Sequence, residues 1–330
     1  MNRHVQFILD HNPNYLWRNR RGADFGDWLA TDQVTFDPAS ARSTPKELVG
    51  TAYWAYSVDL LAQMAQAIGR AEASARLRQL FERIREAFIA TYVTPEGVVG
   101  DGSQTCHVLA LRFGLLPEDI RQAAGERLAA DIRQRGVALT TGFLGTQFIL
   151  DALTDAGFPE IAYDLLLRTD YPSWGYMLRQ GATTLWESWS GEIEWEGRIS
   201  KISQNHFALG SICGFIFRRV AGLDAAAPGF ETIVIRPTRD PRVKKGGGDY
   251  DSVMGRISTD WIQAPDGSFM LDVTIPANAT AHIHLPAQRN SWIEEGGKEI
   301  SLCEDMRVLK RFDHEAVIEV GSGRYRFLVR

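Results

Sequence analysis

Apolar residues recur at helical spacing through the first two thirds of the chain. One stripe consists of Tyr53, Tyr56, Leu60, Met64 and Ala67. Comparable stripes follow over 77–88 and 120–132, and further helical segments are expected over 142–156, 159–168 and 205–221. Because each helix has one apolar face that must be covered, the pattern predicts a series of helical hairpins packed against one another.

Three local signals mark where helices begin or end. Thr44-Pro45-Lys46-Glu47 has the form of a capping box with proline in the first turn, which predicts a helix start. Gly69 predicts the end of the same helix. The stretch 100–105 predicts a turn that caps the next helix.

The apolar pattern changes to strict alternation in the last third of the chain. Over 269–275 the odd-numbered positions are apolar, whereas Asp272 and Thr274 between them are polar. A turn is expected just before this run, at 264–267. Ser322-Gly323 separates two strand-like runs, 315–320 and 324–329. Several short strands at this spacing predict an antiparallel β-sandwich.

The change of period predicts two domains, the first helical and the second made of strands. An Ala-, Pro- and Gly-containing stretch over 223–229 lies where the pattern changes. We therefore expect a helical domain over 1–222 and a β domain over 223–330.

Composition and charge exclude several classes of function. A net charge of -5 disfavours nucleic acid as a partner, since such proteins carry a basic face. The three cysteines are far apart, so neither a metal site nor a disulfide framework is expected, and no cofactor is indicated. No apolar run is long enough to span a membrane, and 1–12 lacks the apolar core of a signal peptide. These features predict a cytoplasmic protein, unless an upstream segment has been lost.

Glu187 is the first candidate for chemistry. It lies between Trp186 and Trp189, after small residues and before Gly191. Apolar surroundings favour the neutral form of a carboxyl group, and such a group can act as a general acid or base. The alternative interpretation is a carboxylate at the rim of the core that caps backbone amides.

Aromatic and polar residues in three other stretches could form a sugar site. They are Asp27 with Trp28, Trp174 with Tyr176, and His206. Sugars have an apolar face that stacks on aromatic rings and hydroxyl groups that bond to carboxylates. The alternatives are a turn with a buried tryptophan around Trp28 and a histidine satisfied at a packing interface at position 206.

Taken together, motifs in one order along nearly the whole chain resemble the α-L-rhamnosidase family of glycoside hydrolases. The helical part contributes 26–29 (GDWL), 44–49 (TPKELV), 140–146 (TTGFLGT), 169–176 (TDYPSWGY), 181–189 (GATTLWESW) and 205–210 (NHFALG). The β part contributes 226–230 (AAPGF), 235–237 (IRP) and 250–257 (YDSVMGRI). No single motif would suffice, but their common order makes the resemblance specific.

The resemblance implies an (α/α)6 barrel as the catalytic domain, followed by a C-terminal β-sandwich. It also implies inverting hydrolysis of terminal α-L-rhamnosides, in which one carboxylic acid protonates the leaving oxygen and another activates water. By position, Glu187 matches the general base. The residues expected to line the sugar pocket are Asp27, Trp28, Trp174, Tyr176, Trp186 and His206.

The chain departs from the family pattern at the general acid. The acid belongs to a motif of the form Asp-x-x-x-Arg-x-Glu-Arg that precedes the GDW segment, and no such motif precedes Gly26 here. About seven or eight helical segments are recognisable, fewer than a complete barrel needs. We therefore expect an N-terminally truncated barrel, with a missing N-terminal part or self-association to cover its apolar seam. The acidic residues near Trp28 that could replace the acid are Asp24, Asp27, Asp32 and Asp37.

Two alternatives to a rhamnoside hydrolase remain. A remnant without a general acid would bind sugar through Trp28 and His206 without cleaving it. A related barrel hydrolase could act on another sugar, such as a uronic-acid oligosaccharide. A uronate would need a cationic clamp, and Arg179 is nearly the only basic residue in these motifs, which favours a neutral sugar.

Overall fold

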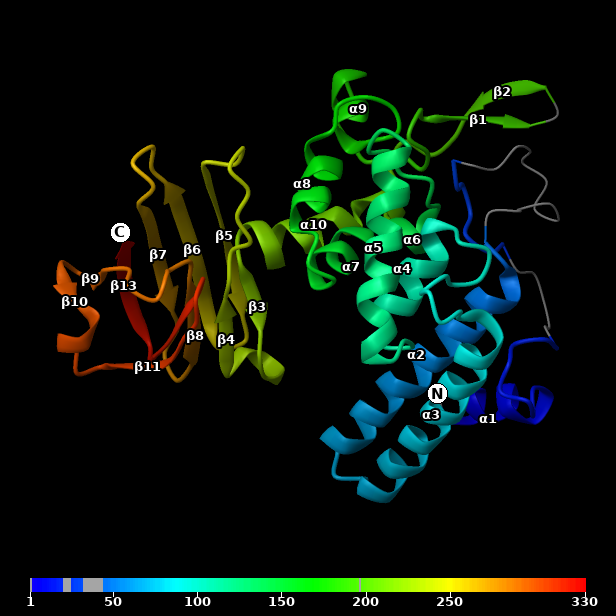
Figure 1. The fold of residues 1–330 in the computed structure, drawn as a ribbon, viewed down its shortest axis with the longest axis horizontal. Coiled ribbons are helices and arrows are strands. Elements are labelled where there is room, and N and C mark those ends of the chain that lie inside the picture. The colour runs from blue at the N-terminus through cyan, green and yellow to red at the C-terminus, as the bar shows by residue number, and fades with distance from the viewer. Residues whose placement is uncertain (1, 20–24, 32–43, 196) are drawn as a thin grey trace. The chain divides into compact units, whose positions relative to one another are not determined.

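The computed structural model describes residues 2–19, 25–31, 44–195 and 197–330. Three of the possible replacement acids, Asp24, Asp32 and Asp37, lie outside the described residues. The chain divides into two compact units, Met1–Ser211 and Ile212–Arg330. Figure 1 shows helices in the first and strands in the second, as the change of period predicts. In the part of the chain that is described, no helix is long and apolar enough to cross a bilayer.

Helices and one small hairpin make up the first unit. Its helices are α1 (Asn2–His11), α2 (Lys46–Ala67), α3 (Ala71–Tyr92), α4 (Gln104–Arg112), α5 (Glu118–Gln134), α6 (Phe143–Thr146), α7 (Ile149–Asp155), α8 (Pro159–Leu167) and α9 (Trp174–Arg179). They are followed by the hairpin strands β1 (Glu192–Trp195) and β2 (Arg198–Lys201) and by the 3-10 turn η1 (Ala208–Ser211). Consecutive helices pack in pairs, α2 on α3, α4 on α5 and α7 on α8, which confirms the predicted helical hairpins.

The apolar stripe expected on α2 is wrong. Tyr53, Tyr56 and Leu60 are only partly buried, and Met64 and Ala67 are exposed. The buried positions are instead Leu48, Val49, Thr51, Ala52, Trp54, Ala55, Val58, Ala62 and Ala65. Because this helix packs against both α3 and α4, apolar residues lie around much of its circumference, and spacing alone does not select the buried side.

The capping box expected at 44–47 does not form. Pro45 precedes the first helical residue without a side-chain cap, and the Thr44 hydroxyl lies 3.3 Å from that of Ser103. Glu47 instead accepts hydrogen bonds from Arg18 and Tyr92. The signal at Gly69 is confirmed, since α2 ends just before it, and Ser103 caps α4 through the Cys106 amide.

The second unit begins with α10 (Ile212–Phe215) and the π-helical turn η2 (Ile216–Val220). Two sheets of mainly antiparallel strands follow. The six-stranded sheet has the order β10 (Lys298–Glu299), β9 (Ile293–Glu295), β13 (Gly323–Val329), β7 (Phe269–Ile275), β6 (Gly255–Gln263) and β5 (Lys245–Ser252). The five-stranded sheet has the order β11 (Met306–Arg311), β12 (Ala316–Val320), β8 (Thr280–Leu285), β4 (Thr232–Ile235) and β3 (Leu223–Ala225). One pairing in it, β4 with β8, is parallel.

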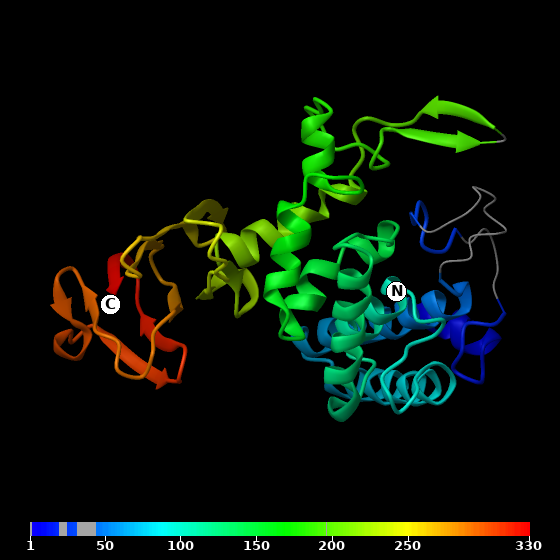
Figure 2. The ribbon, with the colours of Figure 1, turned by 45° about the horizontal axis from the view of Figure 1, so that its top comes forward.

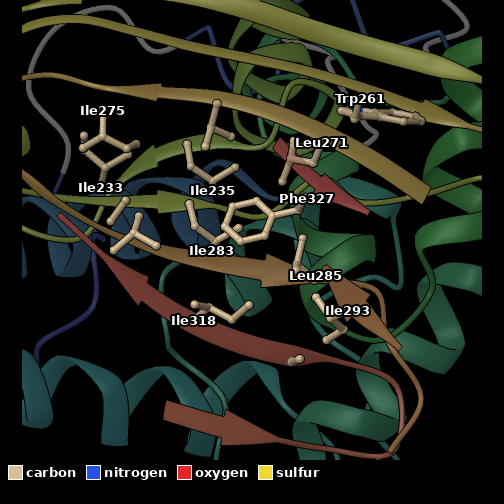
Figure 3. Packing of buried hydrophobic residues seen from close by; sticks show 14 of the residues in the cluster. Ile233, Ile235, Trp261, Leu271, Ile275, Ile283, Leu285, Ile293, Ile318 and Phe327 are labelled. Carbon is tan, nitrogen blue, oxygen red and sulfur yellow. The ribbon is translucent and has the colours of Figure 1, made fainter. Parts of the chain in front are cut away.

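The core of the second unit lies between these sheets. Figure 3 shows side chains such as Ile233, Ile283 and Phe327 packed against one another. The four odd-numbered residues of β7 are all buried, as alternation over 269–275 predicts. The runs on either side of Ser322-Gly323 are strands of different sheets, β12 and β13.

Candidate functional site

A cavity of about 230 Å³ lies in the first unit where three loop segments meet the β1 strand. The segments are 29–31, 141–143 and 187–190, and Tyr171 and Leu209 complete the lining. Three carboxylates are among the lining residues: Glu187, Glu192 and Glu194. The cavity therefore combines acidic groups with apolar and aromatic walls.

Glu187 lines this cavity and is partly exposed. Its backbone amide donates to the Ser203 carbonyl at 2.9 Å, and its carboxylate oxygen Oε2 accepts from the Ser203 amide at 3.3 Å. Among the described residues, its other oxygen, Oε1, accepts no hydrogen bond. Ser203 thus holds both the backbone and the carboxylate of Glu187, while the carboxylate oxygen Oε1 stays available.

Buried tryptophans support the Glu187 segment from behind. Trp186 and Trp189 are buried, and the ring of Trp189 meets that of Trp174 edge to face at 5.1 Å. Trp174 is also buried, and its indole N–H donates to the Leu209 carbonyl at 2.8 Å. Of these rings, only Trp189 lines the cavity, so Trp174 and Trp186 are placed to support the wall from behind.

Asp27 is 2% exposed and does not line the cavity. Its carboxylate accepts hydrogen bonds from the Thr105 hydroxyl and from the amides of Gly142 (2.8 Å), Leu144 (2.8 Å) and Gly145 (3.3 Å). Burial raises the pKa of Asp27, and these hydrogen bonds oppose that shift. The group fixes the loop that begins α6, and that loop forms one wall of the cavity.

The backbone around Trp28 reinforces the same wall. The Trp28 carbonyl accepts from the Phe143 amide at 3.0 Å. A side chain at Gly142 would approach this carbonyl to 2.3 Å, so only glycine allows the two segments to come so close. The Trp28 ring is partly buried and meets Phe25 edge to face at 5.7 Å.

His206 reaches the cavity only through a neighbour. Its ring lies 5.0 Å from that of Phe143, which lines the cavity, and its Nδ1 accepts from the Ala208 amide at 3.2 Å. Nδ1 therefore carries no proton and Nε2 is the donor nitrogen. Tyr176 likewise meets the lining residue Tyr171 edge to face at 5.4 Å. Both predicted residues stand behind the lining.

The sequence reasoning overlooked Glu192 and Glu194. Both belong to β1, which among the described residues forms a two-stranded sheet with β2 (Figures 1 and 2). The hydroxyls of Ser188 and Ser190 donate to the Glu192 carbonyl at 2.8 and 3.1 Å, which ties β1 to the Glu187 segment. The alternation in Glu192-Ile193-Glu194-Trp195 was the available signal, but a strand of four residues is too short for such a pattern to stand out.

No group of three or more potential metal ligands occurs among the residues the structure describes. The residues that line the cavity supply carboxylates, hydroxyls and aromatic rings. This combination suits a polyhydroxylated substrate and acid–base catalysis.

Comparison with protein families gives two matches. Residues 1–220 match the model described as the bacterial alpha-L-rhamnosidase 6 hairpin glycosidase domain. Residues 222–299 match the model described as the bacterial alpha-L-rhamnosidase C-terminal domain.

Individual relatives agree with these matches. An α-L-rhamnosidase of Streptomyces avermitilis is 37% identical over 98% of this chain and 30% of its own length. An α-L-rhamnosidase of Formosa agariphila is 29% identical over 92% of this chain and 33% of its own length. This chain thus spans about a third of the relatives it matches.

Solved structures show the same similarity. The Streptomyces avermitilis α-L-rhamnosidase complexed with L-rhamnose matches with a TM-score of 0.86 and 36% identity, over 99% of this chain and 30% of that one. The α-L-rhamnosidase from Dictyoglumus thermophilum matches with a TM-score of 0.87 and 28% identity, over 100% of this chain and 36% of that one.

Proposed function

Because the chain belongs to the bacterial α-L-rhamnosidase family of glycoside hydrolases, we propose that it catalyses inverting hydrolysis of terminal α-L-rhamnosides with Glu187 as the general base. The observation that carries the proposal is the position of Glu187. It lines the cavity, it is partly exposed, and one of its carboxylate oxygens is uncommitted among the described residues.

In this mechanism the Glu187 carboxylate accepts a proton from water while the water oxygen attacks the anomeric carbon. The glycosidic bond breaks, its electron pair goes to the leaving oxygen, and a general acid protonates that oxygen. The Ser203 amide, which donates to Oε2, orients the carboxylate so that Oε1 can receive the proton. A β-anomer of rhamnose is then the first product.

The general acid must come from elsewhere. Asp27 is unsuited, because its carboxylate is buried and already accepts four hydrogen bonds. Within the described residues, the other carboxylates that line the cavity are Glu192 and Glu194. They are the candidates to test in this chain.

We further propose that the predicted aromatic residues form the sugar-binding wall in two layers. Trp189, Phe143 and Tyr171 line the cavity directly. Behind them stand Trp174, Trp186, Tyr176, His206 and Trp28, which fix their positions. Asp27 acts in the same way, through the backbone of 142–145.

The domain boundary between residues 222 and 223 also remains a proposal. The family models meet between 220 and 222, which supports it. By contrast, α10 and η2 belong to the second compact unit, in which η2 packs with β3 and β5.

The experiment is hydrolysis of an aryl α-L-rhamnoside by this chain, with proton NMR of the anomer released first. We expect β-L-rhamnose to appear first, and Glu187→Gln to slow the reaction about 10²–10⁴-fold. The matched variants Glu192→Gln and Glu194→Gln identify the general acid. Loss of the acid should lower turnover less for a substrate with a good leaving group, such as nitrophenolate, than for one with a poor leaving group. An initial α-anomer, or full activity in Glu187→Gln, would refute the proposal.

A sugar-binding protein without hydrolysis is the second candidate. The four hydrogen bonds to the Asp27 carboxylate favour this candidate, because they make Asp27 unsuited as a replacement for the general acid. Calorimetry with L-rhamnose separates the two candidates. Binding without product release from any aryl rhamnoside would establish the second.

A further inference from the structure

The outer face of the six-stranded sheet carries a groove that the proposed hydrolysis does not use. The groove has a volume of about 950 Å³ and extends over β5, β6, β7 and β13. Alternate residues of these strands are buried against the five-stranded sheet, so the others project into the groove. The groove lies entirely within the second unit.

Polar side chains cross the groove in two rows. The strand register places Gly247, Asp260, Asp272 and Arg326 opposite one another in the first row. It places Asp249, Ser258, Thr274 and Arg324 in the second row. Hydrogen-bond donors and acceptors therefore lie close together over four strands.

The first row contains an unfavourable pairing. Asp260 lies directly opposite Asp272, and like charges in that position destabilise a sheet. Arg326 neutralises Asp272 through bonds of 2.6 and 3.1 Å. Asp260 has no such partner: among the described residues its side chain makes neither an ion pair nor a hydrogen bond. A carboxylate kept in this position is available to a ligand.

Two cations at the groove are similarly available. Within the described ranges, the side chains of Lys245 and Arg324 form no ion pair or hydrogen bond, although both line the groove. At the end of the first row, Gly247 allows the backbone of β5 to approach that of β6 closely. A side chain there would meet the Thr259 carbonyl at 2.3 Å, so the position excludes any larger residue.

An apolar row runs beside the polar rows on the same face. It consists of Ile262, Met270 and Leu328, which the register places opposite one another. Ile262 and Met270 are 43% and 40% exposed. Trp292, two residues before Glu294, which the register places opposite Leu328, is 52% exposed. The face thus offers hydrogen-bonding groups next to exposed apolar surface.

We propose that this groove binds a neutral oligosaccharide chain. Sugar hydroxyls both donate and accept, so they can bond Asp260 on one side and Arg324 or Lys245 on the other. The apolar faces of the sugar rings would lie on the Ile262–Met270–Leu328 row. The groove is lined by both signs of charge, which disfavours a polyanion or a polycation.

The test is affinity electrophoresis of the full chain in gels containing xyloglucan, arabinoxylan or galactomannan, with polygalacturonate as the anionic comparison. We expect retardation in at least one neutral gel. Asp260→Ala and Arg324→Ala should each weaken it about tenfold, since each loses charged hydrogen bonds to the ligand. The matched control is Asp313→Ala, an exposed carboxylate outside the groove, which should migrate as the wild type does.

Three results would overturn the proposal: no retardation in any neutral gel, equal retardation of the groove variants and the wild type, or retardation only in polygalacturonate. The proposal does not rest on the hydrolysis, so Glu187→Gln should be retarded normally and added L-rhamnose should not release the protein. Loss of retardation in Glu187→Gln would place the binding in the cavity instead. Thermal unfolding of Asp260→Asn should match or exceed the wild type, which separates lost binding from lost folding.

Discussion

The two sides of the cavity use their carboxylates in opposite ways. On one side, Asp27 is buried and accepts four hydrogen bonds from Thr105 and the 142–145 backbone. On the other, Glu187 is partly exposed and its carboxylate accepts one, from Ser203. Both residues belong to the helical unit and both carry a carboxylate, so the difference between them lies in their surroundings.

This contrast separates structure from chemistry. A carboxylate surrounded by donors holds backbone in place but cannot easily exchange protons with a substrate. A carboxylate with an uncommitted oxygen in a cavity can do so, at little benefit to stability. The two residues should therefore respond to the same substitution, acid to amide, in opposite ways.

Glu187→Gln should have the largest effect, and on catalysis alone. We expect the turnover of an aryl α-L-rhamnoside to fall about 10²–10⁴-fold, because the amide cannot accept a proton from water. The free energy of unfolding should change by less than about 0.5 kcal/mol, since a single hydrogen bond from the described residues reaches the carboxylate. Steady-state kinetics and urea denaturation measure the two quantities. A large loss of stability would contradict the contrast.

Asp27→Asn should act mainly on stability. In asparagine an NH2 group, itself a donor, would replace one carboxylate oxygen and would face N–H and O–H donors. The free energy of unfolding of the helical unit should therefore fall by about 3 kcal/mol. Thr105→Val is the graded control: it removes one of the four donors and should cost about 1 kcal/mol. Urea denaturation followed by tryptophan fluorescence measures both. An Asp27→Asn protein as stable as the wild type but catalytically dead would reverse the two roles.

Trp174→Phe should sharpen the Glu187 side of the comparison. It removes the bond to the Leu209 carbonyl behind Trp189 and should cost about 1–2 kcal/mol of unfolding free energy. Trp292→Phe is the matched control, since it removes an exposed indole bond to Glu294 and should change stability by under about 0.5 kcal/mol. Equal effects in the two variants would show that burial of the bond does not matter.

The smallest effect concerns pH and the Asp27 side. His107, on α4 with Thr105, is buried, and burial lowers the pKa of its imidazole below the ordinary 6.5. The unfolded chain then binds a proton that the folded chain does not, so stability should fall as pH decreases below about 6.5. Urea midpoints at several pH values test this, with His107→Gln as the comparison. An unchanged pH dependence in that variant would contradict the assignment.

Much of the second unit was predictable because its strands bury one face each. Alternation over 269–275 marks the buried residues of β7 correctly, since a single covered face imposes a period of two. In α2 the same kind of reasoning failed, because neighbours cover more than one side of the helix. The Thr44–Glu47 signal failed because distant residues, Ser103, Arg18 and Tyr92, take up the side chains that would have formed the cap.

At the site, the sequence indicated the residues better than their roles. Glu187 lies at the cavity as expected. Its expected burial between two rings is not seen, because Trp186 and Trp189 are buried while Glu187 is partly exposed. Asp27 was expected to meet sugar, whereas its donors come from positions more than seventy residues away in the chain, which no local motif reveals. Glu192 and Glu194 lie on a strand of four residues, in which the alternation is too short to stand out.

The most direct test of Glu187 as the general base is rescue of Glu187→Ala by azide, followed by proton NMR of the product. Azide is already an anion and needs no base, so we expect it to restore cleavage of an aryl α-L-rhamnoside and to form β-L-rhamnosyl azide. Wild-type protein should form rhamnose under the same conditions. Absence of rescue, or formation of the α-azide, would contradict a base role for Glu187.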